Sequence, residues 1–160
     1  MIKSNIINDK LIALRDIRDF ELNSGARKIL LELKNRGFKL VLVTNQPDVS
    51  RGLVTKFFVD NINNFLKEHL ELDLIKVVYK TESEEPDRYK PAPGMIFEAG
   101  DELNLDLKNS FIVGDRWRDI DAGKNASCKT ILLKSQAIES IKSKPDFEIE
   151  TLTELLNIIN

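Results

Sequence analysis

Short apolar runs alternate with stretches of helical periodicity along most of the chain. Four runs have the length and residue types of buried strands, at residues 38–43, 75–79, 110–113 and 130–133. Between them, apolar residues recur at helical spacing, as at Phe58, Ile62 and Phe65. This alternation predicts an α/β fold with a mainly parallel central sheet and helices on both of its faces.

The ends of the predicted helices carry recognisable signals. Residues 23–25 begin the first helix and Gly37 ends it, while Pro93 suits the first turn of a later helix. Thr151 and Glu154 form a capping box before the last helix. A small edge strand is predicted at residues 147–149. Because no repeat, linker or low-complexity stretch interrupts the pattern, we expect residues 1–160 to form a single domain.

Composition excludes some classes of function. The chain has 24 basic and 26 acidic residues and a net charge of -2, which argues against a broad nucleic-acid or membrane surface. Its one cysteine, Cys128, cannot form an internal disulfide, and no apolar run approaches the length of a membrane span. We therefore expect a cytoplasmic protein, with Cys128 in a buried apolar role and His69 partly exposed.

Polar residues follow two of the predicted strands where those strands end. Thr44, Asn45 and Gln46 follow the strand at 38–43, and their hydroxyl and amide groups suit the oxygens of a phosphoryl group. They could equally cap loose backbone groups. Lys90 precedes two prolines that stiffen its backbone. It is either a positioned ammonium for phosphoryl charge or an exposed loop lysine.

A third polar segment follows the strand at 110–113. Asp115 supplies the hard oxygen ligands that Mg²⁺ prefers, Arg116 could reach an anionic substrate, and Asp119 could hold the local network. The alternative is that Asp115 only caps the next helix. Ligands of parallel sheets bind outside the carboxyl ends of the strands. We therefore expect the three polar segments to meet in one site.

Together these segments resemble the motifs of the haloacid dehalogenase superfamily of phosphatases. Thr44 matches the second motif, Lys90 the third, and Asp115 with Asp119 the acidic fourth. The likeness is greatest to the branch that contains the heptose-bisphosphate and histidinol-phosphate phosphatases, through residues 44–52 (TNQPDVSRG), 90–95 (KPAPGM) and 111–116 (FIVGDR). The resemblance spans roughly residues 3 to 155. It implies a Rossmann-like fold without a large cap domain.

The resemblance also implies an activity and roles for residues. The activity would be Mg²⁺-dependent hydrolysis of a phosphate monoester of a small metabolite, such as D-glycero-D-manno-heptose 1,7-bisphosphate, with histidinol phosphate as the alternative. Thr44 and Lys90 would hold the transferring phosphoryl group, Asp115 would hold Mg²⁺ and Asp119 would support them. Substrate contacts would come from Asn45, Gln46, Arg51 and Arg116. Members of the branch are often monomeric, so we expect a monomer.

The first motif of the superfamily is not found in its expected place. It is an Asp-x-Asp pair at the end of the first strand, whose first carboxylate attacks phosphorus while the second transfers protons. No such pair precedes the first helix here. Asp16 and Asp19 are the nearest candidates, but they are three positions apart. Residues 1–5 resemble the segment directly after the motif. The central strand is therefore expected to be missing, which would leave two unpaired strand edges.

Three explanations fit this departure. The preferred one is a start codon assigned too far downstream or a shortened sequence, which the in-frame codons upstream of Met1 would reveal. The second is a catalytically inactive phosphate- or partner-binding domain, and the third is a site completed by another chain. A receiver-type signalling domain is disfavoured by residues 90–95.

Two further differences concern ligands. Many heptose-bisphosphate members carry a Cys/His zinc loop before the lysine motif, but residues 79–89 contain neither residue, so no zinc is expected. Tyr89 stands where many members have an arginine that contacts the substrate. Arg88 or Arg116 is expected to compensate.

Overall fold

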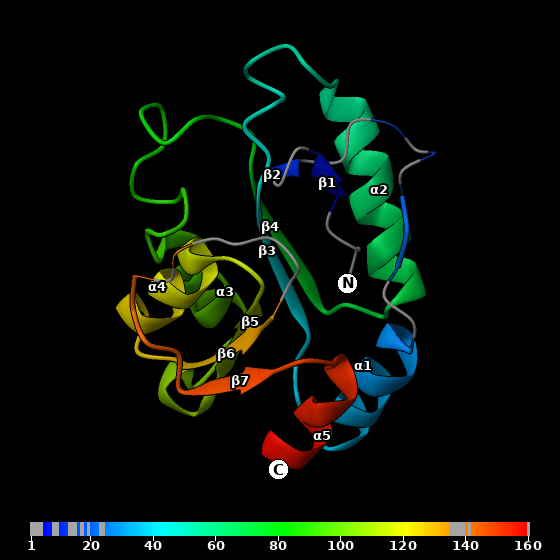
Figure 1. The fold of residues 1–160 in the computed structure, drawn as a ribbon, viewed down its shortest axis with the longest axis vertical. Helices are drawn as coiled ribbons and strands as arrows, with labels where there is room; N and C mark the ends of the chain where they lie inside the picture. Colours follow the sequence, from blue (N-terminus) through cyan, green and yellow to red (C-terminus); the bar gives the residue numbers. More distant parts are fainter. Residues whose placement is uncertain are drawn as a thin grey trace.

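The computed structural model describes residues 5–7, 10–12, 16, 18, 20–22, 25–134, 140 and 142–159 (Figure 1). The strands are β1 (Asn5–Ile7), β2 (Lys10–Ile12), β3 (Val41–Asn45), β4 (Leu74–Val78), β5 (Phe111–Gly114), β6 (Lys129–Leu133) and β7 (Phe147–Ile149). The helices are α1 (Ala26–Asn35), α2 (Lys56–His69), α3 (Gly94–Leu103), α4 (Trp117–Asn125) and α5 (Leu155–Ile158), with 3-10 turns η2 (Leu107–Asn109) and η3 (Leu152–Glu154). Among these helices, none has the length and apolar character of a membrane span.

The parallel strands form two separate sheets. Within the described residues, β3 pairs with β4 alone, while β5 pairs with β6 and β6 with β7. β1 and β2 form a small antiparallel hairpin of their own. The predicted α/β fold with parallel strands is confirmed. Its sheet is divided between β3 and β5.

Both sheets nevertheless lie between the same two layers of helices. Val43 of β3 and Ile112 of β5 pack against one buried cluster, which contains residues of α3 and α4. On the other face, Leu42 packs against α2, while Val113 packs against a cluster built from α1, β6, β7 and α5. Leu30 of α1 contacts both of these last two clusters. The two sheets are therefore halves of one layer.

The unpaired edge of β3 is turned toward β5. The amide of Gln46 donates to Val78 O, so even-numbered positions of β3 direct their backbone groups to β4 and Val41 and Val43 direct theirs away. Val43 O accepts a hydrogen bond from Lys90 Nζ at 2.9 Å, and the same ammonium contacts Asp119, just beyond β5. The edge of β3 that lacks a strand partner thus faces the segment that follows β5.

The strands at this division are less well covered than the rest of the layer. All five residues of β3 are partly exposed, whereas three consecutive residues of β6, Thr130, Ile131 and Leu132, are buried. Backbone groups of Phe111 and Val113 face away from β6, because the neighbouring Ser110 O accepts from Lys129 N. We call the region between the free edges of β3 and β5 the strand slot. Among the described strands, the two unpaired edges expected from the sequence are found there.

Most predicted elements appear within a few residues of their expected positions. The strand predicted at residues 38–43 is β3, which begins at Val41 rather than Phe38. The amide of Leu40 donates to the Asp73 carboxylate, and the amide of Phe38 donates to Leu33 O at the end of α1. The capping box at Thr151 is confirmed by hydrogen bonds from its amide and hydroxyl to Glu154, and Cys128 is buried as predicted. The β1–β2 hairpin was not predicted.

Asp146 connects the buried strand β6 to the segment before β7. Its Oδ2 accepts from Thr130 N at 2.7 Å and Thr130 Oγ1 at 2.8 Å, and Lys124 Nζ donates to Oδ1 at 2.6 Å. The Lys124 hydrogen bond, together with those from Thr130, lowers the pKa of Asp146 from 3.8 to about 2. Thr130 is fully buried, so loss of these hydrogen bonds would leave its polar groups without a partner and out of reach of water.

Replacing Asp146 with alanine is expected to destabilise the fold by about 1–3 kcal/mol at pH 7, measured by urea unfolding. Because the folded-state pKa is depressed, the contribution is complete above pH 4 and disappears as pH falls toward 2. Glu148→Ala, which removes only an exposed ion pair with Lys134, is the control and should cost less than about 1 kcal/mol. A difference between wild type and Asp146→Ala that stays constant from pH 5 to pH 2 would contradict this assignment.

Candidate functional site

Lys90 lies where the carboxyl ends of β3 and β5 come together. Its Nζ donates to Val43 O at 2.9 Å and to Asp119 Oδ1 at 2.6 Å. The lysine and aspartate side chains are only 12% and 15% exposed, so this is a largely desolvated ion pair. An ammonium held so firmly is positioned to balance negative charge at the mouth of the strand slot. It is not the exposed loop lysine of the alternative interpretation.

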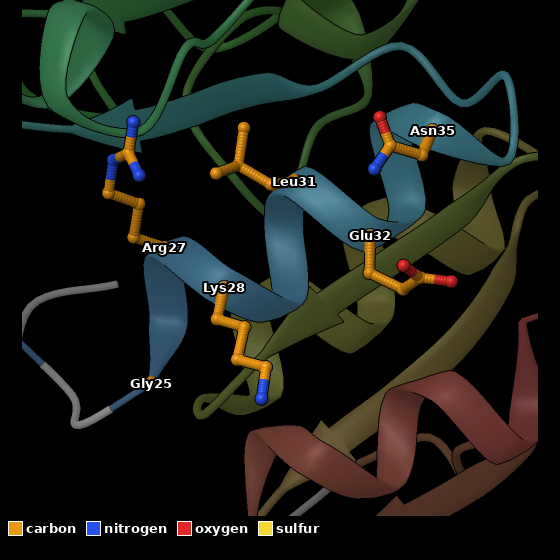
Figure 2. A pocket seen from close by; sticks show the side chains of 6 residues that line it. All are labelled: Gly25, Arg27, Lys28, Leu31, Glu32 and Asn35. Atoms are coloured by element: carbon orange, nitrogen blue, oxygen red, sulfur yellow. The ribbon is translucent and has the colours of Figure 1, made fainter.

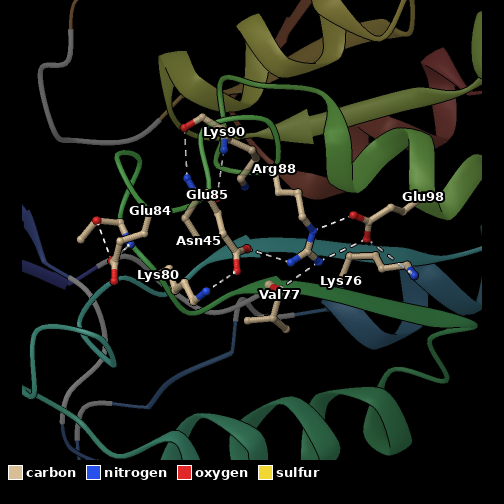
Figure 3. Close-up of polar contacts among 10 residues, drawn as sticks. Asn45, Lys76, Val77, Lys80, Glu84, Glu85, Arg88, Lys90 and Glu98 are labelled. Carbon is tan, nitrogen blue, oxygen red and sulfur yellow. Dashed lines mark hydrogen bonds and ion pairs between the residues drawn. The ribbon is translucent and has the colours of Figure 1, made fainter.

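Asn45 fixes the backbone that carries Lys90. Its Nδ2 donates to Lys90 O and its Oδ1 accepts from Lys90 N, both at 3.1 Å (Figure 3). The amide therefore positions the lysine, a role that the sequence did not reveal, since the expected role was a substrate contact. Beside it, Gln46 Nε2 donates to Thr44 Oγ1 at 3.2 Å. With its oxygen already accepting from Gln46, the Thr44 hydroxyl can donate its proton to a ligand.

Each carboxylate oxygen of Asp119 accepts a different hydrogen bond. Oδ1 holds Lys90, and Oδ2 accepts from the amide of Arg116 at 3.2 Å, at the start of α4. A methyl group on Gly114 would lie 2.2 Å from Asp119 Cβ, so the strand end needs glycine to let this side chain approach. Asp119 thus caps the first turn of α4. Asp115 lies directly after β5 and is half buried.

The donor chemistry at the end of β5 fits Mg²⁺. Mg²⁺ is commonly bound through one or two carboxylates, with waters and substrate phosphate completing its octahedron. Asp115 could supply one such carboxylate, whereas Asp119 Oδ1 is bound by Lys90. No group of three or more His, Cys, Asp or Glu side chains suited to a metal occurs among the residues described. The described side chains thus fit a Mg²⁺ ion that takes much of its coordination from substrate and water.

The described residues do not assemble a nucleophile pair. The one Asp-x-Asp in the sequence, at Asp119 and Asp121, lies in α4, where positions two apart point in different directions. Asp121 Oδ1 is buried without a hydrogen-bond partner in this part of the structure. Asp16 is bound by Arg18, whose hydrogen bonds lower its pKa to about 2. Asp19 lies outside the described residues.

Arg88 and Arg51 are held by different carboxylates. Arg88 donates from Nε to Glu98 at 2.6 Å and from Nη1 to Glu85 at 2.9 Å, and these contacts raise its pKa (Figure 3). Arg88 is therefore held beside β4 by two carboxylates, and its expected compensation for the residue at Tyr89 stays a prediction. Arg51 is half exposed and pairs with the buried Asp48 carboxylate at 3.2 Å.

Sequence reasoning missed Arg118. Its Nη1 donates to Lys90 O at 3.2 Å and to Glu82 Oε2 at 3.0 Å. The available signal was its position three residues after Asp115, in the first turn of the following helix, where side chains surround the strand end. Arg116 is part-buried at the same turn, and its backbone amide donates to Asp119 Oδ2.

A surface hollow of about 540 Å³ lies on the outer side of α1 (Figure 2). It is lined by Gly25, Arg27, Lys28, Leu31, Glu32 and Asn35. In Figure 1, α1 lies at the amino end of β3, whereas Thr44 and Asn45 are at its carboxyl end. None of the predicted site residues lines this hollow, so it is separate from the strand-end site.

Comparison with protein families identifies one match. The model of the haloacid dehalogenase-like hydrolases matches residues 5–133. The chain is 32% identical over 160 residues to D-glycero-beta-D-manno-heptose-1,7-bisphosphate 7-phosphatase of Pasteurella multocida, which covers 91% of this chain and 87% of that protein. It is 30% identical over 162 residues to D-glycero-alpha-D-manno-heptose-1,7-bisphosphate 7-phosphatase of Campylobacter jejuni, and the match covers 97% of this chain and 91% of that protein.

Solved structures give a consistent picture of the fold. A D,D-heptose 1,7-bisphosphate phosphatase from B. bronchiseptica, complexed with magnesium and phosphate, superposes with a TM-score of 0.79 at 21% identity. The match covers 97% of this chain and 93% of that one. A putative HAD-like phosphatase from Mesorhizobium loti has a TM-score of 0.74 at 28% identity, covering 91% and 77% of the two chains.

Proposed function

Since the chain belongs to the haloacid dehalogenase-like hydrolases and is by family a phosphoric monoester hydrolase, we propose that residues 1–160 form the phosphoryl-binding part of a Mg²⁺-dependent sugar-phosphate phosphatase. The observation that carries this proposal is the ammonium of Lys90, held between Val43 O and Asp119 at the carboxyl ends of two parallel strands. Such a group stabilises the charge of a transferring phosphoryl group.

The remaining side chains have complementary roles in this proposal. Thr44 Oγ1 and Lys90 Nζ hold two oxygens of the phosphoryl group, and Asp115 binds Mg²⁺. When bound, the cation neutralises phosphate charge and fixes the orientation of the group. Gln46 orients the hydroxyl of Thr44, and Arg51 and Arg116 contact the rest of the substrate.

The strand slot supports a specific source for the nucleophile. Residues two apart on a strand point to the same side, unlike Asp119 and Asp121 on their helix. A strand inserted between β3 and β5 and ending in Asp-x-Asp would present both carboxylates at the strand-end site. The first attacks phosphorus to form an aspartyl-phosphate as the bond to the leaving oxygen breaks, and the second gives that oxygen its proton. The second then accepts a proton from the water that hydrolyses the intermediate.

Relatives support heptose 1,7-bisphosphate as the preferred substrate. Relatives in Pasteurella multocida, Helicobacter pylori and Campylobacter jejuni bear the name of heptose-bisphosphate 7-phosphatases, and each match covers more than four fifths of this chain. Histidinol phosphate is the second candidate. We place the protein in the cytoplasm as a monomer that acts on a free metabolite. The alternative function, an inactive phosphate- or partner-binding domain, is favoured by the lack of an assembled nucleophile pair in the described residues.

A substrate panel tests the proposal. The chain, extended at its N-terminus by an apolar strand ending in Asp-x-Asp, is assayed for phosphate release in Mg²⁺ with heptose 1,7-bisphosphate, histidinol phosphate and common sugar monophosphates. We expect the highest kcat/KM with the heptose bisphosphate, and a requirement for Asp115 that Asp115→Asn reveals. Phosphate release from histidinol phosphate but from no other compound of the panel would show that histidinol phosphate is the substrate. A well-folded extended protein that binds phosphate but hydrolyses nothing would support the inactive domain.

A further inference from the structure

We propose that Arg118 binds a second anionic group of the substrate, at the end of the molecule away from the phosphoryl group that Lys90 holds. This inference rests on the proposed function, because it names a specificity residue of the same site. The chemistry that Arg118 would recognise is a phosphate or a similar dianion carried on a small metabolite.

The guanidinium of Arg118 lies next to the strand-end site but not inside it. Nη1 donates to the backbone oxygen of Lys90 at 3.2 Å. The ammonium of that lysine reaches in another direction, to Val43 O and Asp119. The guanidinium thus contacts the backbone of Lys90, whereas the ammonium is at the far end of the lysine side chain, an arrangement that suits a ligand with two anionic groups.

The guanidinium of Arg118 has N–H donors beyond those that bind the protein. Its hydrogen bonds to Lys90 O and to Glu82 Oε2 both come from Nη1. Within the described part of the chain, Nε and Nη2 donate to no protein acceptor. These two nitrogens form the fork that binds two oxygens of one phosphate. The side chain is 32% exposed, so a ligand can reach the fork.

Aromatic rings hold the guanidinium in place. Its central carbon lies 4.6 Å from the ring centre of Trp117 and 5.4 Å from that of Tyr89. Contacts of this kind orient a planar cation while leaving its edge available for hydrogen bonding. Arg118 therefore differs from Arg88, whose Nε and Nη1 are occupied by carboxylates.

The competing interpretation is that Arg118 and Glu82 only anchor the loop between β4 and α3. Glu82 is 56% exposed, and exposed ion pairs contribute little to stability and are displaced by stronger anions. The two interpretations differ in what they predict for Glu82. If Glu82 occupies an anion-binding fork, removing its charge should help a ligand; if it is an anchor, removing its charge should harm the site.

The test compares a bisphosphate with phosphate alone. Glucose 1,6-bisphosphate and inorganic phosphate are titrated calorimetrically into the 160-residue chain in Mg²⁺. Wild type should bind the bisphosphate about tenfold more tightly than phosphate. Arg118→Ala should reduce this ratio toward one, Arg118→Lys should restore part of it, and Glu82→Gln should increase it. Lys142→Ala is the matched control, because Lys142 contacts Trp117 at 3.6 Å from its ring centre, and it should leave the ratio unchanged.

The outcomes separate this inference from the function on which it rests. Equal weakening of bisphosphate binding by Arg118→Ala and Glu82→Gln identifies a structural anchor and overturns the inference. A ratio that Arg118→Ala does not change overturns it as well, while phosphate binding still supports the proposed function. If wild type binds neither ligand, the proposed phosphoryl site fails and the role of Arg118 fails with it.

Discussion

Replacing Lys90 with methionine is expected to destabilise the protein by about 3–5 kcal/mol and to weaken phosphate binding about 10- to 100-fold. Methionine keeps the length of the side chain but removes the ammonium. Asp119, only 15% exposed, then keeps its charge without the partner 2.6 Å away. Val43 O also loses its hydrogen bond. Urea unfolding measures the first effect and titration with inorganic phosphate in Mg²⁺ the second.

A double variant separates these two effects. Lys90→Met combined with Asp119→Leu removes both charges, so most of the lost stability should return. Phosphate affinity should stay low, because the ammonium is still missing. If the double variant is no more stable than Lys90→Met alone, the ion pair is not the source of the loss. If phosphate binds both variants as tightly as wild type, Lys90 is not part of the site.

Adding an apolar strand that ends in Asp-x-Asp to the N-terminus is expected to complete the divided sheet. The added strand would pair with the free edges of β3 and β5 and cover partly exposed side chains such as Val43 and Val113. Burial of a few such side chains should raise the free energy of unfolding by about 3 kcal/mol or more. Hydrogen exchange provides a local readout, since the amides of Val41 and Phe111 face the slot and should become protected.

A control extension distinguishes insertion in the slot from a general effect of added residues. The same strand with a central proline lacks one backbone donor and cannot pair along its whole length. It should give little protection and little added stability. Protection limited to the β1–β2 hairpin, with β3 and β5 exchanging as before, would show that the added strand pairs elsewhere.

The sequence was sufficient to predict which residues lie near the strand ends, but not the hydrogen bonds that join them. Thr44 and Asp115 could be placed because each comes just after an apolar run, and parallel strands collect such positions at one edge of a sheet. Lys90 was singled out by the prolines that follow it. The clamp between Asn45 and Lys90 joins residues 45 positions apart, and local patterns do not contain that pairing. The same is true of Arg118 and Glu82, which are 36 positions apart.

Side-chain roles were predicted less well than positions, for a physical reason. Asp115 and Asp119 are chemically identical, and only the fold decides that Asp119 holds Lys90 and the first turn of α4. Arg88 and Arg118 likewise differ only through the carboxylates that surround them in three dimensions. The division of the sheet, by contrast, was predictable, because it follows from which strands are present.

The central claim is that this chain carries a phosphoryl-binding site that becomes catalytic when a strand supplies two carboxylates. The most direct measurement is phosphate release from heptose 1,7-bisphosphate in Mg²⁺ by three proteins: the 160-residue chain, the chain extended with Asp-x-Asp, and the same extension with Asn-x-Asn. Since removal of a catalytic nucleophile can cost on the order of 10⁶-fold in rate, the Asp-x-Asp form should exceed the other two by at least about 10³-fold. Equal rates for all three proteins would contradict the claim.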